Sequence, residues 1–288
     1  MSKVTLESQL FEIIKDKEMA ENIKLAKVDM LVRLGVDVNA MYGAKSALMF
    51  ANDKKEQKIA EFLKDNGAKE VFDKDEARNL GKKLGVKCHN GDGCDIDEVK
   101  ELIDQGAEID VVYEGGPIFT SLIWASGNGY TDVVEYLIEK GANINQKMRE
   151  DVTPLMWACV KKQIDIMELL IKKGADINVK DEGGDTPLMH ASNYGYMNIV
   201  EMLVEKGANV NEVTNGKRTA LMKAVMNEHY EIAEYLITNG ADVNAKDRDG
   251  KTALMFAEDE KMKKTIISAV KKRNEKNVEN EIVRGIER

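Results

Sequence analysis

Apolar residues recur along this chain at helical spacing, and the same arrangement returns every 33 residues. Between residues 186 and 207 the pattern predicts a short first helix and a second helix whose apolar residues lie three or four apart. The apolar positions of that second helix are Ile199, Val200, Leu203 and Val204. Gly207 ends the unit, because glycine takes up the left-handed conformation that stops a helix at little cost.

The 33-residue interval is kept by several residue types at once. A threonine opens each first helix, at Thr120, Thr153, Thr186, Thr219 and Thr252. A glycine ends each second helix, at Gly141, Gly174, Gly207 and Gly240. A fixed period of this length is typical of a solenoid and overrides any domain count based on length alone.

The pattern changes outside this regular region. Residues 1–67 are predicted to hold an N-terminal cap and the first repeats. Residues 68–119 contain no Thr-Pro-Leu start and are interpreted as a degenerate repeat with an enlarged loop around Cys88 to Cys94. Residues 120–273 are predicted to be regular repeats and a C-terminal cap with a polar outer face. Residues 274–288 form a charged tail that either frays or extends the last helix.

The motif Thr-Pro-Leu-x-x-Ala at 186–191, the exit Gly-Ala-x-x-Asn at 207–211 and the period resemble the ankyrin repeat. The resemblance implies an all-α fold with short β-hairpin loops, an ankyrin-repeat α-solenoid of about eight helix-pair units including caps. It also implies a concave face and hairpin fingers that bind other proteins. The family usually has histidine where this chain has methionine, as at Met189, so apolar packing is expected to replace the hydrogen bonds of that histidine.

Composition narrows the classes of partner. A net charge of −9 argues against a general affinity for nucleic acid or an anionic membrane. Three cysteines make no disulfide framework, which points to a reducing compartment. There is no signal-peptide core and no apolar run of the ~18 residues that a membrane helix needs. We expect a cytoplasmic monomer that has no nucleic-acid or membrane partner.

One cluster carries candidate chemistry, the sequence Cys88-His89-x4-Cys94. Thiolates and imidazole are zinc ligands, but the spacing is not a common finger pattern and no fourth ligand is obvious. An ordinary loop, a redox cysteine pair and a metal site remain open. The alternative function is therefore a metal- or redox-responsive regulatory module centred on residues 88–98.

The rest of the chain offers no catalytic pattern. His190 and His229 have no nucleophile nearby in the periodic plan, and no glycine-rich stretch matches a phosphate loop. We expect a non-enzymatic scaffold for protein–protein interaction that has no cofactor, no catalytic residue and no assigned metal ligand.

Candidates for partner binding are residues that differ between equivalent positions of the repeats. On the inner face these are Trp124, Asn128, Trp157, Lys161, His190 and Tyr194. On the fingers they are Tyr113, Arg149, Asp181, Glu182, Lys217 and Arg218. Trp124 and Trp157 lie one repeat apart, so their rings either pack against the adjacent repeat or flank an inserted partner side chain, a cationic one included.

Overall fold

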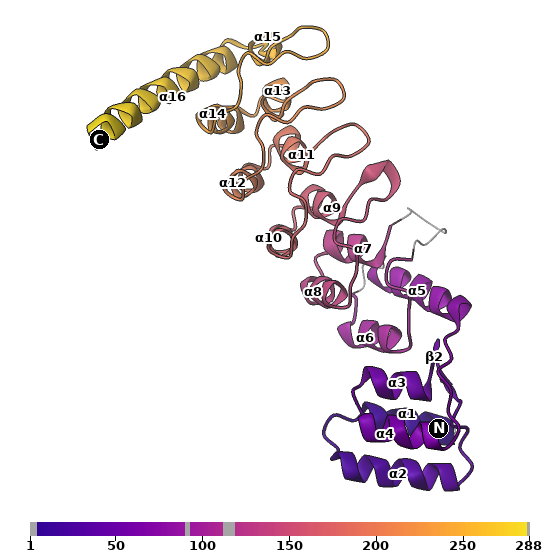
Figure 1. The fold of residues 1–288 in the computed structure, drawn as a ribbon. Coiled ribbons are helices and arrows are strands. Elements are labelled where there is room, and N and C mark those ends of the chain that lie inside the picture. The colour runs from indigo at the N-terminus through magenta and orange to yellow at the C-terminus, as the bar shows by residue number, and fades with distance from the viewer. Residues whose placement is uncertain (1–4, 90–92, 112–118, 287–288) are drawn as a thin grey trace. The chain divides into compact units, whose positions relative to one another are not determined.

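The computed structural model describes residues 5–89, 93–111 and 119–286 (Figure 1). It divides into two compact units, Met1–Tyr113 and Glu114–Arg288, and each is considered by itself. Within the described residues, sixteen α-helices follow one another as eight successive pairs. The predicted all-α fold of about eight helix-pair units is therefore confirmed.

The first unit contains three helix pairs and one short hairpin. Its elements are α1 (Leu6–Lys15), α2 (Glu21–Arg33), β1 (Met41–Tyr42), β2 (Lys45–Ser46), α3 (Ala47–Asp53), α4 (Gln57–Asp65), α5 (Lys74–His89) and α6 (Ile96–Asp104). The antiparallel strands β1 and β2 pair Met41 with Ser46 and Tyr42 with Lys45. The pair α1–α2 packs on α3–α4, and α5 packs on α6.

Aromatic rings fill the centre of the first two helix pairs. The ring centroid of Phe11 lies 5.0 Å from that of Tyr42 and 5.6 Å from that of Phe50, both within the range of favourable aromatic contact. Lys24 on α2 is buried and forms an ion pair with Glu56, which supplies the charge partner that a buried ammonium requires. The N-terminal cap therefore has an apolar core of its own.

The structure corrects one boundary in the degenerate repeat. Cys88 and His89 were expected in a loop, but they form the last turn of α5. Leu80, Leu84 and Cys88 recur at intervals of four and are all buried, so one continuous apolar face carries the helix onward through this turn.

The second unit contains five helix pairs. Its elements are α7 (Ser121–Asn128), α8 (Thr131–Glu139), the 3-10 turn η1 (Arg149–Asp151), α9 (Pro154–Val160), α10 (Ile164–Lys172), α11 (Pro187–Tyr194), α12 (Met197–Glu205), α13 (Ala220–Met226), α14 (Tyr230–Thr238), α15 (Ala253–Phe256) and α16 (Glu260–Ile286). The first helices α7, α9, α11, α13 and α15 contact one another in series and form one row, while α8, α10, α12 and α14 form a second row (Figure 1).

Small and apolar residues pack at the contacts between these helices. The alanine of each first helix is completely buried in α7, α9, α11 and α13, at Ala125, Ala158, Ala191 and Ala224. The methionine that stands in place of the family's histidine is also buried, at Met156, Met189 and Met222. The expected apolar packing of these methionines is confirmed.

Threonine starts the first helices by capping them. The Met189 N–H donates to Thr186 Oγ1 at 3.3 Å, and the Met222 N–H donates to Thr219 Oγ1 at 3.2 Å. These bonds satisfy a backbone donor that has no partner within the helix. Thr252 makes no such side-chain bond before α15, which is only four residues long.

The asparagine that ends the Gly-Ala-x-x-Asn exit joins each repeat to the next. The Asn209 N–H donates to Asn178 Oδ1 at 2.8 Å, and the Asp242 N–H donates to Asn211 Oδ1 at 2.8 Å. Asn211 Nδ2 also donates to Gly240 O at 3.1 Å. The motif thus pairs backbone groups of the following repeat that the helices leave without partners.

The C-terminal cap differs from the expected polar outer face. Leu254 is 41% exposed, Met255 is 67% exposed and Ile267 is 61% exposed. The first two occupy the positions that are buried at Leu221 and Met222, where the next repeat covers them. Helix α16 continues to Ile286, so the charged tail extends the last helix. Among the described residues, no helix combines the length and the apolar character needed to span a bilayer.

We expect Leu188→Ala to lower the free energy of unfolding by ~2–5 kcal/mol, because Leu188 is only 1% exposed and its loss leaves a cavity. The control is Leu254→Ala at the same position of the last repeat, with an expected loss of about 1 kcal/mol or less. Urea denaturation followed by circular dichroism measures both variants. Equal losses of unfolding free energy in the two variants would contradict the expectation that burial decides the cost.

A second pair of variants tests the asparagine links. We expect Asn211→Ala to destabilise the chain by about 0.5–1.5 kcal/mol per hydrogen bond lost, because its side chain bonds the next repeat twice. Asn244 holds the same place in the last exit motif, and Asn244→Ala should leave the urea midpoint nearly unchanged. A loss at Asn244 as large as that at Asn211 would show that the links do not matter.

Candidate functional site

Residues along the first-helix row of the second unit differ in how far they are exposed. Tyr194 on α11 is 49% exposed and Met226 on α13 is 42% exposed, whereas Trp124 on α7 is 9% exposed. Lys161, which follows α9, is exposed, and Trp157 is half-buried. The accessible part of the row therefore runs along α9, α11 and α13.

The two tryptophans pack against each other and against Phe119. The ring centroid of Phe119 lies 5.1 Å from Trp124 and 4.9 Å from Trp157, and the two indoles meet edge to face at 6.4 Å. Gly127 admits the Trp157 ring, since a Cβ there would lie 2.2 Å from Trp157 Cδ1. Of the two arrangements that the sequence left open, the structure has the packed one, because the rings of Phe119, Trp124 and Trp157 contact one another.

A row of three aromatic rings lies along α11 instead. His190 stacks on Tyr194 with centroids 6.5 Å apart, and Tyr194 stacks on Tyr196 at 5.5 Å. Lys162 Nζ lies 4.1 Å from the centre of the Tyr196 ring, a cation–π contact. His190 Nε2 lies 2.9 Å from Asp181 Oδ2, which joins the row to a finger.

Sequence reasoning missed Tyr196 and Lys162. The signal for Tyr196 was the sequence Tyr194-Gly195-Tyr196. Gly195 takes a φ of +75°, which turns the chain after α11 and brings the second tyrosine beside the first.

A polar hollow of about 350 Å³ lies where the fingers meet α13. Lys223 Nζ forms an ion pair with Asp185 Oδ1 at 2.7 Å on its wall. Asp247, 5% exposed, accepts the backbone N–H of Lys251 at 2.8 Å and lies 3.9 Å from Arg218 Nε. The hollow thus brings both signs of charge together from three successive repeats.

Backbone hydrogen bonds hold successive fingers in register. The Asn215 N–H donates to Gly183 O at 3.0 Å, and the Arg248 N–H donates to Gly216 O at 3.0 Å. Arg248 Nη2 also donates to Asn215 O at 3.1 Å. The fingers are tight turns closed by a few bonds, such as Asp181 N–H to Asp185 O and Gly184 N–H to Asp181 O. The second unit shows no regular strand among its described residues.

The remaining predicted residues occupy varied positions. The side chains of Arg149, Glu182 and Lys217 are exposed on the fingers, while Asn128 is half-buried at the end of α7. Tyr113 lies outside the described residues. The accessible candidates are thus concentrated on the fingers and on α9 to α13.

The candidate metal and redox cluster lies in the first unit. The Sγ atoms of Cys88 and Cys94 are 3.6 Å apart. No group of three or more His, Cys, Asp or Glu side chains suited to a metal ion occurs among the described residues. The geometry brings Cys88 and Cys94 together.

A curated relative shares a short segment with this chain. Alpha-latrocrustotoxin-Lt1a of Latrodectus tredecimguttatus is 45% identical over 58 residues, which is 20% of this chain and 4% of the toxin. The similarity therefore concerns a small part of that much longer protein.

A family model described as ankyrin repeats matches three overlapping stretches, residues 86–181, 178–247 and 218–280. Together they cover residues 86–280, more than half of the chain. The matched region includes the threonine caps, the buried alanines and the asparagine links described above. The chain belongs to the ankyrin-repeat family.

Proposed function

We propose that the second unit binds another protein through a surface made of α9, α11, α13 and the fingers at 146–151, 181–185 and 214–218. Ankyrin repeats are generally protein–protein interaction modules and typically non-enzymatic, which supports the class of function. The observation that carries the site is the half-exposed ring of Tyr194, held between His190 and Tyr196.

The aromatic row suits an anchor for a partner. Tyrosine buries a large area at low entropic cost, and a ring already stacked on both sides loses little freedom on binding. Trp157 lies on the neighbouring helix α9, with Lys161 Nζ 4.9 Å from its ring centre. Burial of Tyr194 by a partner would therefore supply much of the binding energy.

The charged groups around the row supply selectivity. Asp181 and Asp185 are already paired with His190 and Lys223, so a partner must match this arrangement or leave charges unpaired. Glu182 and Lys217 present opposite charges at neighbouring fingers. Mixed signs favour a specific protein over a uniform polyanion.

We expect Tyr194→Ala to weaken binding at least tenfold while changing the free energy of unfolding by about 1 kcal/mol or less, because half of the ring is exposed. Partners captured by the immobilised chain are quantified by mass spectrometry, and the dissociation constant of the leading candidate is then measured by calorimetry. Tyr235→Ala on α14, in the second helix row, is the control and should retain the same partners. Loss of the same partners from both variants would reject the proposed surface.

Trp124→Ala tests whether Trp124 packs within the fold or anchors a partner. We expect it to cost ~3–5 kcal/mol of stability, because the ring is 9% exposed and packs on Phe119 and Trp157. Chemical denaturation measures the loss. An unchanged denaturation midpoint combined with lost binding would restore Trp124 as an anchor.

A further inference from the structure

Two cysteines meet where α5 ends and α6 is about to begin. Cys88 is completely buried in the last turn of α5, and Cys94 is half-buried just before Asp95, the residue that caps α6. Their Sγ atoms lie 3.6 Å apart, in hydrogen-bond contact. An S–S bond requires the sulfur atoms to approach by about 1.5 Å more.

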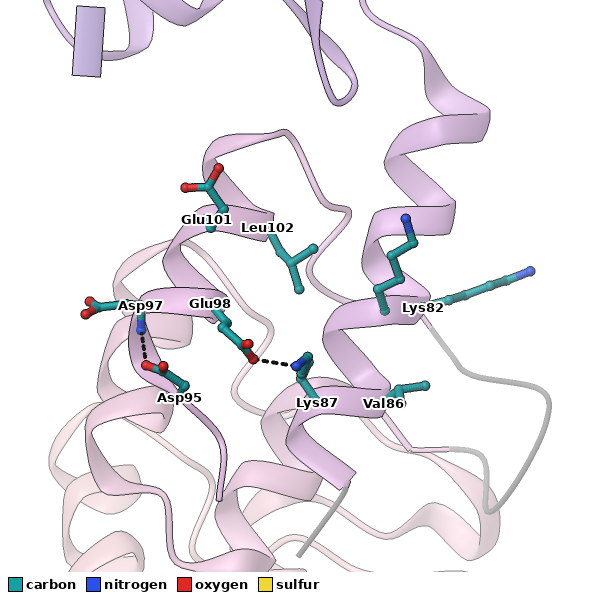
Figure 2. A pocket seen from close by; sticks show the side chains of 9 residues that line it. Lys82, Val86, Lys87, Asp95, Asp97, Glu98, Glu101 and Leu102 are labelled. Atoms are coloured by element: carbon teal, nitrogen blue, oxygen red, sulfur yellow. Dashed lines mark hydrogen bonds and ion pairs between the residues drawn. The ribbon is translucent and has the colours of Figure 1, made fainter. Parts of the chain in front are cut away.

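The neighbours of both cysteines already tie the two helices together. Lys87 on α5 forms an ion pair with Glu98 on α6 at 2.5 Å, as Figure 2 shows. Asp95 accepts the Asp97 N–H at 2.9 Å and thereby holds the start of α6 (Figure 2). A hollow of about 710 Å³ opens beside them between α5 and α6, lined by residues such as Lys82, Val86 and Leu102.

The two sulfur atoms have different surroundings. The pKa of Cys88 is raised well above its ordinary value, first by its hydrogen bond to Cys94 and then by burial, so Cys88 keeps its proton. The pKa of Lys87, one residue before Cys88, is raised first by its hydrogen bond to Glu98 and by the charge of Glu98, and to a smaller extent by the charge of Cys94. A nearby cation favours a reactive thiolate.

We propose that Cys88 and Cys94 form a reversible disulfide, with a peroxide as the oxidant. The Cys94 thiolate attacks one peroxide oxygen, the O–O bond breaks, and Cys94 becomes a sulfenic acid while hydroxide leaves and is protonated to water. Cys88 then attacks the Cys94 sulfur and the S–O bond breaks, while the Cys88 proton passes to the leaving hydroxide and forms a second water. The two thiols have lost two electrons, and the peroxide has gained them.

The bond would join the last turn of α5 directly to the residue that precedes the cap of α6. It would thereby hold one end of the hollow between the two helices and restrict the opening of this helix pair. The proposal concerns the first unit alone and does not depend on the protein-binding surface of the second.

The test uses the full chain, reduced with dithiothreitol, desalted and exposed to hydrogen peroxide. The remaining thiols are then alkylated with N-ethylmaleimide in denaturant. We expect two of the three cysteines to escape alkylation, a mass about 2 Da below that of the reduced chain before labelling, and a linked Cys88–Cys94 peptide. Dithiothreitol should restore all three labelling sites.

Cys159 provides the matched control. It is also completely buried, and burial raises its pKa to about 12, but its Sγ donates to Pro187 O at 3.5 Å instead of facing another sulfur. Cys159→Ser should oxidise like the unaltered chain. Cys88→Ser should instead leave a sulfenic or sulfinic acid on Cys94 and form no internal link.

Three results would overturn the proposal. One is full alkylation of Cys88 and Cys94 in the unaltered chain under peroxide that oxidises a cysteine-containing peptide in the same tube. Another is a link that involves Cys159. The third is stoichiometric zinc bound to the purified reduced chain, which would make the pair metal ligands. Peptide mapping of the unaltered chain gives the decisive answer even if a serine variant fails to fold.

Discussion

Apolar contact between successive first helices holds the second unit together. Each helix pair has one face that it cannot bury alone, and the next pair covers it. Completely buried alanines such as Ala191 and Ala224 let the helix backbones approach, and Leu188 and Met189 fill the space between them. Where no neighbour follows, at Leu254 and Met255, the same positions are exposed. The 33-residue period therefore records a packing requirement that every interior repeat must meet.

Hydrogen bonds orient the repeats within this apolar packing. Threonine caps begin the first helices, and asparagine side chains such as Asn211 bond backbone groups of the following repeat. Finger-to-finger bonds repeat at the same interval. Because these bonds satisfy backbone groups that the helices leave open, they set the spacing of the fingers and thereby the places where charged side chains meet. The polar hollow beside α13 forms where the fingers, held at this spacing, bring their charged side chains together.

In each unit, one local departure from the repeat pattern changes which side chains are accessible. In the second unit a glycine at 127 lets Trp157 pack into α7, which turns two tryptophans from surface candidates into packing residues. In the first unit a longer apolar face extends α5 and brings Cys88 to Cys94. Both departures come from a few residues and alter which atoms are accessible for chemistry or binding.

The sequence by itself determined the period, the helix pairs, the threonine starts and the glycine ends, because these depend on local spacing and backbone conformation. It also named Tyr194, His190 and the finger residues as surface candidates. Only the tertiary structure decided that Trp124 is buried, that Tyr196 stacks on Tyr194, that Asp185 pairs with Lys223 and that Cys88 faces Cys94. These pairings depend on how neighbouring helices and turns pack in space, and a one-dimensional pattern of apolar and polar positions does not contain those distances.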